Sequence, residues 1–356
     1  MTSQMSPSRP IHQPLHPDIR PLLDPEYTTF HEKYLQYVLP DERKTWDGSV
    51  RSAKPAWPST ESPHTPVGHI QDLKLGDSDS GFEIRIFKPR DEQDPPHSGR
   101  PVFLWFHGGG WAIGGINDNN DLCTLVCDRA KCIVISVGYR LAPENPYPAA
   151  VEDAVTALQW VVSPEGEKTV GTVDVNRIAV GGLSAGGNLA TVLSMKAAML
   201  GPPIQICFQL LVVPVIDNTA AVDTIWAGNR YAPWLTPSRM EWYRRMYLPE
   251  YYADIDSGKI GQLDWDASPN LAASEILALN PSTFVAVAGQ DLLAPEARSY
   301  ARQMEEASEG QGIKDRRATV KVYEGATHSI LAMSGVLKQG AQLLNDCADQ
   351  VAAALA

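Results

Sequence analysis

The stretch best suited to chemistry is a serine between glycines, Gly182-Leu183-Ser184-Ala185-Gly186, which has the pattern G-x-S-x-G. The apolar run 178–180 precedes it, and an amphipathic helix pattern follows as far as about Leu200. A serine on such a sharp strand-to-helix turn has a strained backbone and projects its hydroxyl from the end of the strand. The helix N-terminus adds free N–H groups and the positive end of the helix dipole. The stretch therefore predicts that Ser184 is a nucleophile.

Polar residues also follow three other predicted strands. They are His107-Gly108-Gly109-Gly110-Trp111 after the run 102–106, Asp291 after the run 283–288, and His328 after the run 320–323. Because ligands of open α/β sheets bind at the carboxyl ends of the strands, we expect these residues beside Ser184. The chain order Ser, Asp, His is the order found in α/β-hydrolases.

The chemistry of these side chains gives each a role. A serine hydroxyl is a poor nucleophile until a base takes its proton. We predict that His328 is this base and that it later protonates the leaving alkoxide, while Asp291 holds the imidazole tautomer and stabilises its cation. A tetrahedral oxyanion needs preorganised donors. We expect an oxyanion hole made by the backbone N–H groups of Ala185, Gly108 and Gly109.

Some of these polar residues also have a structural reading. Asp291 could instead cap the helix that follows it, and His328 could be a hydrogen-bonded loop histidine. We assign His107 a structural role within its own loop, and we expect Arg140 and Glu144 to hold a loop beneath the site.

The hydrophobic pattern supplies the elements that position the site. From residue 101 onward, apolar runs typical of strands buried on both faces alternate with helices, which predicts a mostly parallel, doubly wound α/β sheet. Two alternating strands, 69–75 and 82–87, predict an antiparallel hairpin at the N-terminal edge of that sheet. The buried strands are expected at 102–106, 132–136, 178–180, 204–215, 283–288 and 320–323, and the helices at 25–38, 120–130, 149–162, 185–200, 237–248, 294–306 and 335–353.

Two segments break this alternation. Residues 1–66 are rich in proline and carry one amphipathic helix, and residues 216–270 are dense in tyrosine and tryptophan. We expect 1–66 to contribute to a cap and 216–270 to be a helical cap insertion over the carboxyl edge of the sheet. Residues 67–215 and 271–356 then form the α/β core. The first dozen residues are predicted to be disordered.

Aromatic side chains are the candidates for contact with a substrate. Tyr and Trp combine an apolar ring with a polar tip, which suits a partly wet apolar lid. We predict substrate contacts for Trp111, Tyr231 and Trp234, and we expect Trp46 and Trp57 to anchor the connector 40–66.

Taken together, these motifs resemble the hormone-sensitive-lipase family of α/β-hydrolases. The resemblance implies an α/β-hydrolase fold with a cap, carboxylesterase activity, and the roles given above for the serine, the acid, the histidine and the glycine loop. One position departs from the family pattern, which usually has Asp or Thr where this chain has Leu183. We expect its surroundings to be apolar to match it. The matching pieces are 107–111, Tyr139-Arg140-Leu141-Ala142-Pro143-Glu144, 182–190, Asp291-Leu292 and Gly325-Ala326-Thr327-His328.

Three functions are compatible with these motifs. The first is a serine hydrolase that cleaves carboxylic esters of small to medium acyl chains through an acyl-enzyme. The second is a biosynthetic ester hydrolase or acyltransferase dedicated to one secondary metabolite. The third is a non-catalytic small-molecule receptor on the same fold, which the presence of His328 disfavours because such relatives have lost the histidine.

Composition limits the partners. The 356 residues carry a net charge of −12, which argues against nucleic acid, and no apolar run approaches the length of a membrane span. Five cysteines, an odd number, fit reduced thiols in a cytoplasmic protein. Cys123 and Cys127 lie one helical turn apart without further Cys or His nearby, so we predict no metal site and no cofactor. We leave open whether the chain forms a homodimer.

Overall fold

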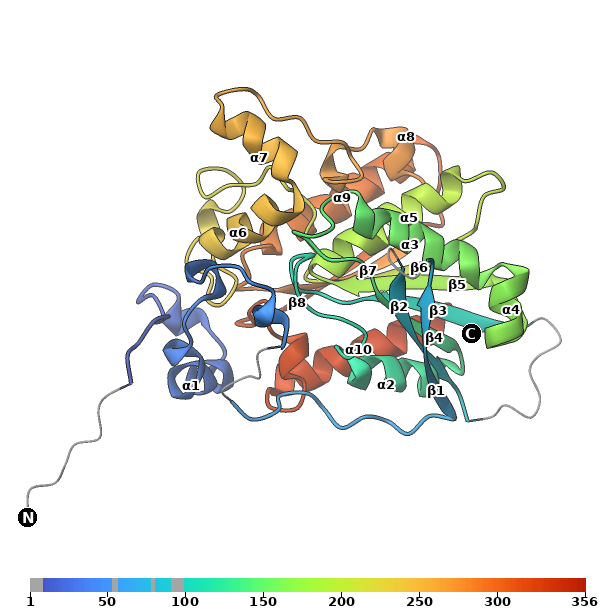
Figure 1. Ribbon diagram of the computed structural model, residues 1–356, viewed down its shortest axis with the longest axis horizontal. Helices are drawn as coiled ribbons and strands as arrows, with labels where there is room; N and C mark the ends of the chain where they lie inside the picture. Colours follow the sequence, from blue (N-terminus) through green and yellow to red (C-terminus); the bar gives the residue numbers. More distant parts are fainter. Residues whose placement is uncertain (1–8, 53–56, 78–80, 91–98) are drawn as a thin grey trace, which may run out of the picture.

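The computed structural model describes residues 9–52, 57–77, 81–90 and 99–356, and within them eight strands form one sheet in the order β1-β2-β4-β3-β5-β6-β7-β8 (Figure 1). β1 pairs antiparallel with β2, and β2 pairs antiparallel with β4, whereas all later pairs are parallel. The predicted antiparallel edge and mostly parallel sheet are therefore confirmed. The strands are β1 (His69–Leu75), β2 (Phe82–Lys88), β3 (Arg100–Phe106), β4 (Ile133–Gly138), β5 (Val173–Leu183), β6 (Phe208–Val212), β7 (Ser282–Ala288) and β8 (Ala318–Tyr323).

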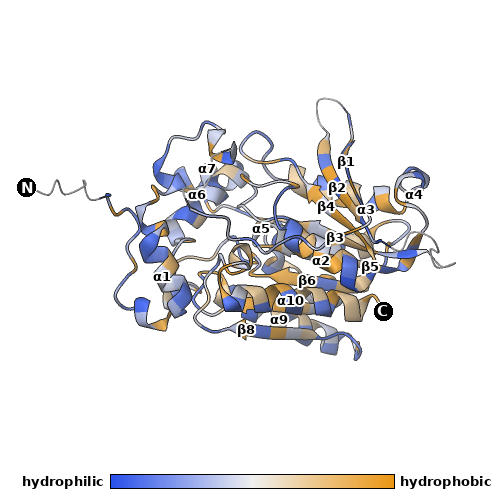
Figure 2. Ribbon diagram, turned by 90° about the horizontal axis from the view of Figure 1, so that it is seen from below, coloured by the Kyte–Doolittle hydropathy of each residue, from blue (hydrophilic) through white to orange (hydrophobic). Residues whose placement is uncertain are grey.

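Helices cover both faces of the sheet, so nearly all residues of the central strands β3, β4 and β6 are buried. α2 (Asn120–Ala130) and α10 (Lys338–Ala354) pack on one face, and α3 (Ala149–Val161), α5 (Ala185–Met199) and α9 (Ala294–Gly310) pack on the other (Figure 1). Alternate residues of β3 show the division: Phe103 and Trp105 join the α2–α10 core, while Leu104 joins the α3–α5–α9 core. Figure 2 shows the hydrophobic residues concentrated along these strands.

Smaller helices gather at the ends of the sheet. α1, α6 and α7 lie together at the end opposite β1, β2 and α4, as both Figure 1 and Figure 2 show. The predicted helix 237–248 is confirmed as α6. Sequence reasoning missed three short helices: α4, α7 and α8. The bounds are α1 (Pro25–Lys33), α4 (Pro164–Val170), α6 (Pro237–Tyr247), α7 (Pro249–Asp256) and α8 (Ser274–Leu277).

Two predicted elements are shorter than expected. The helix predicted over 25–38 ends at Lys33, because Tyr34 leaves helical geometry with φ −128°, and a 3₁₀ turn follows. The strand predicted over 204–215 is confined to Phe208–Val212 and ends before Val213, whose positive φ of 40° turns the chain. Residues 53–56 of the connector 40–66 and residues 1–8 lie outside the described part, so what was predicted for them stays a prediction.

The N-terminal segment packs against the C-terminal part of the chain. Tyr27 and Leu35 are buried with Met333 and Leu337 in a small apolar cluster, against which Trp234 also packs. The two predicted anchors make edge or tilted ring contacts with the 216–270 segment, Trp46 with Trp242 and Trp57 with Trp234, each at 5.7 Å between ring centroids. Residues 1–66 and 216–270 are thus joined by aromatic contacts.

Candidate active site

Ser184 stands on a strained turn between β5 and α5. Its backbone has φ 56° and ψ −116°, a conformation that L-residues adopt only when the surroundings enforce it. Its N–H donates to the carbonyl of Val212 at 2.9 Å, which ties the turn to the end of β6. A Cβ on Gly182 would lie 2.1 Å from the carbonyl oxygen of Gly186, and one on Gly186 would lie 2.0 Å from that of Phe106. Only glycine fits at these two positions.

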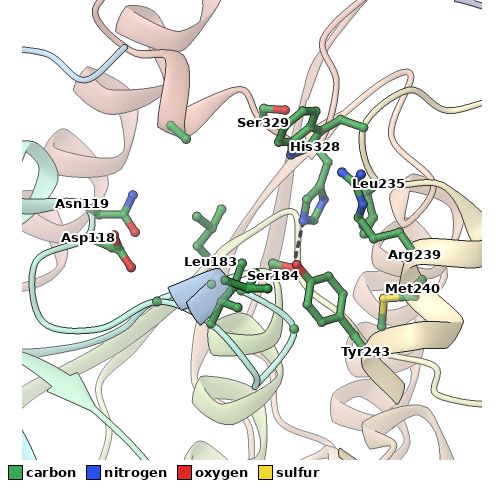
Figure 3. A pocket seen from close by; sticks show the side chains of 18 of the residues that line it. Asp118, Asn119, Leu183, Ser184, Leu235, Arg239, Met240, Tyr243, His328 and Ser329 are labelled. Atoms are coloured by element: carbon green, nitrogen blue, oxygen red, sulfur yellow. Dashed lines mark hydrogen bonds between the residues drawn. The ribbon is translucent and has the colours of Figure 1, made fainter. Parts of the chain in front are cut away.

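Three polar side chains from different strand ends form a hydrogen-bonded chain. Nε2 of His328 lies 2.8 Å from Oγ of Ser184 (Figure 3). Nδ1 of His328 lies 2.9 Å from Oδ2 of Asp291. Asp291 is 1% exposed and Ser184 5%. The alternative that Asp291 caps α9 is wrong, because the N-cap of that helix is Leu293 and accepts no side-chain bond. His328 is a hydrogen-bonded loop residue, as the structural reading expected, but its partners are the side chains of Ser184 and Asp291.

The loop that carries His328 is braced by the N-terminal segment, which sequence reasoning did not foresee. The Asp24 N–H donates to the carbonyl of Gly325 at 2.9 Å, and Nε2 of Gln339 donates both to Oδ2 of Asp24 and to the carbonyl of Glu324. Gly325 has φ 75°, and a Cβ there would lie 2.9 Å from the Asp24 nitrogen. Only the folded chain brings these distant segments together.

The glycine loop after β3 offers free backbone donors. Among the described residues, the N–H groups of Gly108, Gly109 and Ala185 make no hydrogen bond to protein. Gly108 and Gly109 line the cavity that contains Ser184, and Ala185 is buried at the first position of α5. Gly109 has φ 110°, and a Cβ there would lie 2.2 Å from the carbonyl oxygen of Ile113. The arrangement suits an oxyanion hole, whose donors must be in place before the reaction.

His107 is structural, as its loop position indicates. Its Nδ1 lies 2.7 Å from the carbonyl oxygen of Gly108, and its ring stacks on Tyr139 at 4.3 Å between centroids. The Tyr139 hydroxyl donates to the His107 carbonyl at 2.9 Å. Complete burial lowers the pKa of His107, so the ring stays neutral inside the protein.

Arg140 and Glu144 hold the neighbouring loop by ion pairs. Nε of Arg140 donates to the buried carboxylate of Asp153 at 2.9 Å, and Nη2 of Arg51 donates to Glu144 at 2.5 Å. Arg51 also donates to the backbone carbonyls of Ala112 and Ala142, so it ties this loop to the glycine loop. Their predicted structural role is confirmed.

The site opens into a cavity of about 410 Å³ whose walls differ in character. Figure 3 shows Ser184, Leu183 and His328 in the middle, Asp118 and Asn119 on one side, and residues of α6 and the segment before it on the other. The α6 side consists of Trp234, Leu235, Arg239, Met240 and Tyr243.

Of the three aromatics predicted to contact substrate, only Trp234 lines this cavity. Trp111 is fully buried and stacks face to face on Tyr247 at 4.1 Å between centroids, so it does not face the cavity. Its positive φ of 59° turns the side chain into the core beneath the glycine loop. Tyr231 lies in a neighbouring cavity and stacks on His16 at 3.6 Å. The predictions for Trp111 and Tyr231 are corrected accordingly.

Tyr243 and Met240 are site residues that the sequence signalled only weakly. Both occupy one face of the predicted helix 237–248, a spacing that indicates burial but not what the face meets. The Tyr243 ring packs directly on Gly110, where a Cβ would lie 2.2 Å from its Cγ. Gly110 is therefore required for α6 to approach the glycine loop.

Leu183 lies between the nucleophile and the glycine loop. Its side chain lines the cavity and packs, partly buried, against the α2–α10 core. A Cβ on Gly108 would lie 3.2 Å from Cγ of Leu183, so the two residues are in close contact. The expectation of apolar surroundings is confirmed on the core side, while the other side faces the cavity.

A buried carboxylate ties the 216–270 segment to α9. Oε1 of Glu296 accepts the Ile216 N–H at 2.9 Å, and Oε2 accepts Nε1–H of Trp226 at 3.0 Å. Burial raises the pKa of Glu296 to about 8, although the nearby Arg244 opposes the shift. Among the described residues, no three His, Cys, Asp or Glu side chains are placed to hold a metal ion, and no helix is long and apolar enough to cross a membrane.

Comparison with known proteins identifies the architecture. A family model described as the alpha/beta hydrolase fold matches residues 103–332. The chain is 38% identical to an AB hydrolase superfamily protein of Schizosaccharomyces pombe, over 96% of this chain and 97% of that protein. It is 33% identical to the esterase LipI of Mycobacterium tuberculosis, over 78% of this chain and 82% of LipI. It is 30% identical to the carboxylesterase NlhH of that organism, over 73% and 78% of the two chains.

Solved structures give the same result. An esterase from a study of two fungal esterases of Rhizomucor miehei superposes with a TM-score of 0.75 at 26% identity, over 93% of this chain and 96% of that one. The carboxylesterase EstE1, cloned from a metagenomic library, superposes with a TM-score of 0.69 at 30% identity, over 82% of this chain and 90% of EstE1.

Proposed function

Since the chain belongs to the α/β-hydrolase family and, within it, to the hormone-sensitive-lipase-like carboxylesterases, we propose that it hydrolyses carboxylic esters through an acyl-enzyme on Ser184. The observation that carries the proposal is the hydrogen-bonded chain from Asp291 through His328 to Ser184. The strained turn beneath the serine and the free N–H groups opposite it are the parts that acyl transfer requires.

The reaction follows from this geometry. His328 takes the Ser184 hydroxyl proton on Nε2 as the oxygen attacks the ester carbonyl, and Asp291 stabilises the resulting imidazolium. The N–H groups of Gly108, Gly109 and Ala185 receive the oxyanion. His328 then gives its proton to the leaving alcohol. A water molecule, deprotonated by the same imidazole, releases the acid from the acyl-enzyme and restores the serine.

The cavity supports substrates of small to medium acyl chain. Its volume of about 410 Å³ lies toward the lower end of the range of about 300–1,000 Å³ for small-molecule sites. We also propose that residues 1–66 and 216–270 together cap the site, because Trp57 of the first segment contacts Trp234 of the second, and Trp234 lines the cavity. Residues 67–215 and 271–356 are then the hydrolase core.

Two further expectations stay proposals. The five cysteines are free, which fits a reducing, cytoplasmic location. Transfer of the acyl group to an alcohol other than water would use the same acyl-enzyme, and adding acceptor alcohols to the hydrolysis assay separates the two outcomes.

The test is hydrolysis of p-nitrophenyl butyrate by Ser184→Ala. We expect kcat to fall by roughly 10⁴- to 10⁶-fold with the thermal melt preserved. Ser194→Ala is the matched control, because this serine is also buried on α5 but bonds only to Ala190 and Gln209. Retention of more than a few per cent of the turnover in Ser184→Ala would exclude Ser184 as the nucleophile.

A second variant tests whether the residues act as a unit. His328→Ala should lose about as much activity as Ser184→Ala, and the double variant should be no slower than either single variant, because the losses of such residues do not add. Losses that multiply in the double variant would contradict the shared role.

A further inference from the structure

The cavity wall opposite α6 carries two carboxylates. Glu61 comes from the N-terminal connector and Asp118 from the loop after the glycine loop, and both line the cavity that contains Ser184. The proposed ester hydrolysis uses neither of them. Figure 3 shows Asp118 and the adjacent Asn119 across the cavity from Arg239 and Tyr243.

These carboxylates are poorly neutralised by the protein. In the described part of the chain, Glu61 forms only a long ion pair, in which its Oε2 lies 3.9 Å from Nε2 of His64. Asp118 accepts the Gly115 N–H at 2.9 Å, and the ion pairs of the described residues do not include it. The two arginines of the same cavity have other partners: Arg51 pairs with Glu144 at 2.5 Å and Arg239 with Glu42 at 2.8 Å.

An unpartnered buried oxygen on the same wall points independently to a ligand. Asn119 is only 4% exposed and lines the cavity, and its Oδ1 has no hydrogen-bond partner among the described residues. Buried polar atoms are rarely left unpaired, because the loss of hydration costs about 1–3 kcal/mol. Asn119 is held with φ 57°, so its position is set by the backbone. Within the described ranges, the wall therefore combines one buried oxygen acceptor that lacks a donor with two carboxylates that have no close cation.

The two carboxylates also repel each other. Burial first, and then the negative charges of Asp121 and Asp118, raise the pKa of Glu61. A positive charge placed between the carboxylates would relieve this repulsion. No three acidic, histidine or cysteine side chains of the described residues are grouped to hold a metal ion, so an organic cation is the better match.

We propose that the wall formed by Glu61, Asp118 and Asn119 binds a protonated amine of the ester substrate, so that the enzyme prefers cationic esters to neutral esters of the same shape. The opposite wall of Trp234, Met240 and Tyr243 then takes the apolar part. This inference rests on the proposed ester hydrolysis and names a substrate class for it.

The experiment compares pairs of esters that differ only in charge. The alcohol-side pair is 2-(dimethylamino)ethyl butyrate, protonated at pH 7, and 3-methylbutyl butyrate. The acyl-side pair is ethyl 4-(dimethylamino)butanoate and ethyl 5-methylhexanoate. Hydrolysis is followed by titration of the released acid. In one of the two pairs we expect the cationic ester to have a kcat/KM about tenfold higher, since attraction in a partly exposed site is reduced by solvent.

Conservative variants test whether the wall carboxylates cause the preference for cationic esters. Glu61→Gln and Asp118→Asn keep the shape and the acceptor oxygen, and each should lower the preference about threefold or more while the neutral ester changes less than twofold. Glu241→Gln is the control, because it removes a carboxylate on the exposed side of α6 with the same change in net charge. The proposal would be overturned if the cationic ester were hydrolysed no faster than the neutral ester in both pairs. It would also be overturned if both Glu61→Gln and Asp118→Asn left the preference for the cationic ester unchanged.

A binding measurement keeps the two proposals separable. In the Ser184→Ala protein, 2-(dimethylamino)ethyl butyrate or ethyl 4-(dimethylamino)butanoate should raise the melting temperature more than its neutral partner, whether or not the wild type hydrolyses either ester. Equal shifts in both pairs would overturn the charge preference alone. Failure of the wild type to hydrolyse any ester, p-nitrophenyl butyrate included, would overturn the proposed function alone.

Discussion

Replacing Gly110 by alanine should disturb the site through the contact between the glycine loop and α6. A Cβ at this position would lie 2.2, 2.3 and 2.6 Å from Cγ, Cδ1 and Cδ2 of Tyr243, distances that no pair of carbon atoms can keep. The added atom meets the rigid base of a buried ring. The backbone itself also resists the change, because Gly110 has φ 58°.

The size of the effect follows from these two terms. A left-handed conformation costs a residue with a Cβ about 1–2 kcal/mol, and overpacking a filled site costs about 1–3 kcal/mol. Together the two terms predict a loss of about 2–5 kcal/mol in the free energy of unfolding. If the loop moves instead of the ring, Gly108 and Gly109 move with it. Activity then falls by up to the roughly 10²- to 10³-fold typical of a lost oxyanion-hole donor.

The assay is a thermal melt combined with kcat/KM for p-nitrophenyl butyrate. Gly115→Ala is the matched control in the same loop, because a Cβ there meets nothing within 4 Å and the residue has no positive φ. In the double variant with Tyr243→Ala, the steric part should disappear and only the backbone part should remain. If Gly110→Ala is as stable and active as Gly115→Ala, the close packing of α6 on the glycine loop is refuted.

Three further predictions concern the residues around the nucleophile and the anchor of the insertion. Asp291→Asn should lower kcat about 10⁴-fold with little change in the melting temperature, because the amide keeps the volume but favours the wrong tautomer of His328; a loss below tenfold would contradict this. Leu183→Asp should lower both melting temperature and activity, because it puts a charge against an apolar core and adds a further carboxylate to the cavity that Asp118 lines; an equally stable variant with higher turnover would show that Leu183 is a defect. Burial raises the pKa of Glu296 from 4.5 to about 8, so the folded protein holds a proton that the unfolded chain has lost between these pH values. The protonated Glu296 therefore stabilises the fold fully below pH 4.5, and this contribution is lost as the pH rises to 8. In thermal melts from pH 5 to 8, the wild type should lose stability relative to Glu296→Gln. Melting temperatures of the two proteins that change in parallel with pH would exclude the raised pKa.

Local sequence patterns predict much of the site. The glycines at 182 and 186 are needed because a Cβ would meet backbone within the turn or on the adjacent strand β3, so the residue types themselves indicate the nucleophile turn. Buried strands of a parallel sheet read as continuous apolar runs, and their carboxyl ends meet at one edge. The sequence alone therefore predicts Asp291 and His328 beside Ser184, and the structure brings the three within hydrogen-bonding distance.

What surrounds the triad was decided only by the tertiary structure. Trp111 follows the glycine loop directly, yet its positive φ sends the ring into the core against Tyr247, and composition carries no information on that direction. The brace between Asp24 and Gly325 joins the two ends of the chain, a contact that no local pattern encodes. The acidic wall likewise comes from residues that lie far apart in the sequence, Glu61 and Asp118. Side-chain type and spacing determine the reacting groups, whereas the shape and charge of the cavity depend on long-range packing.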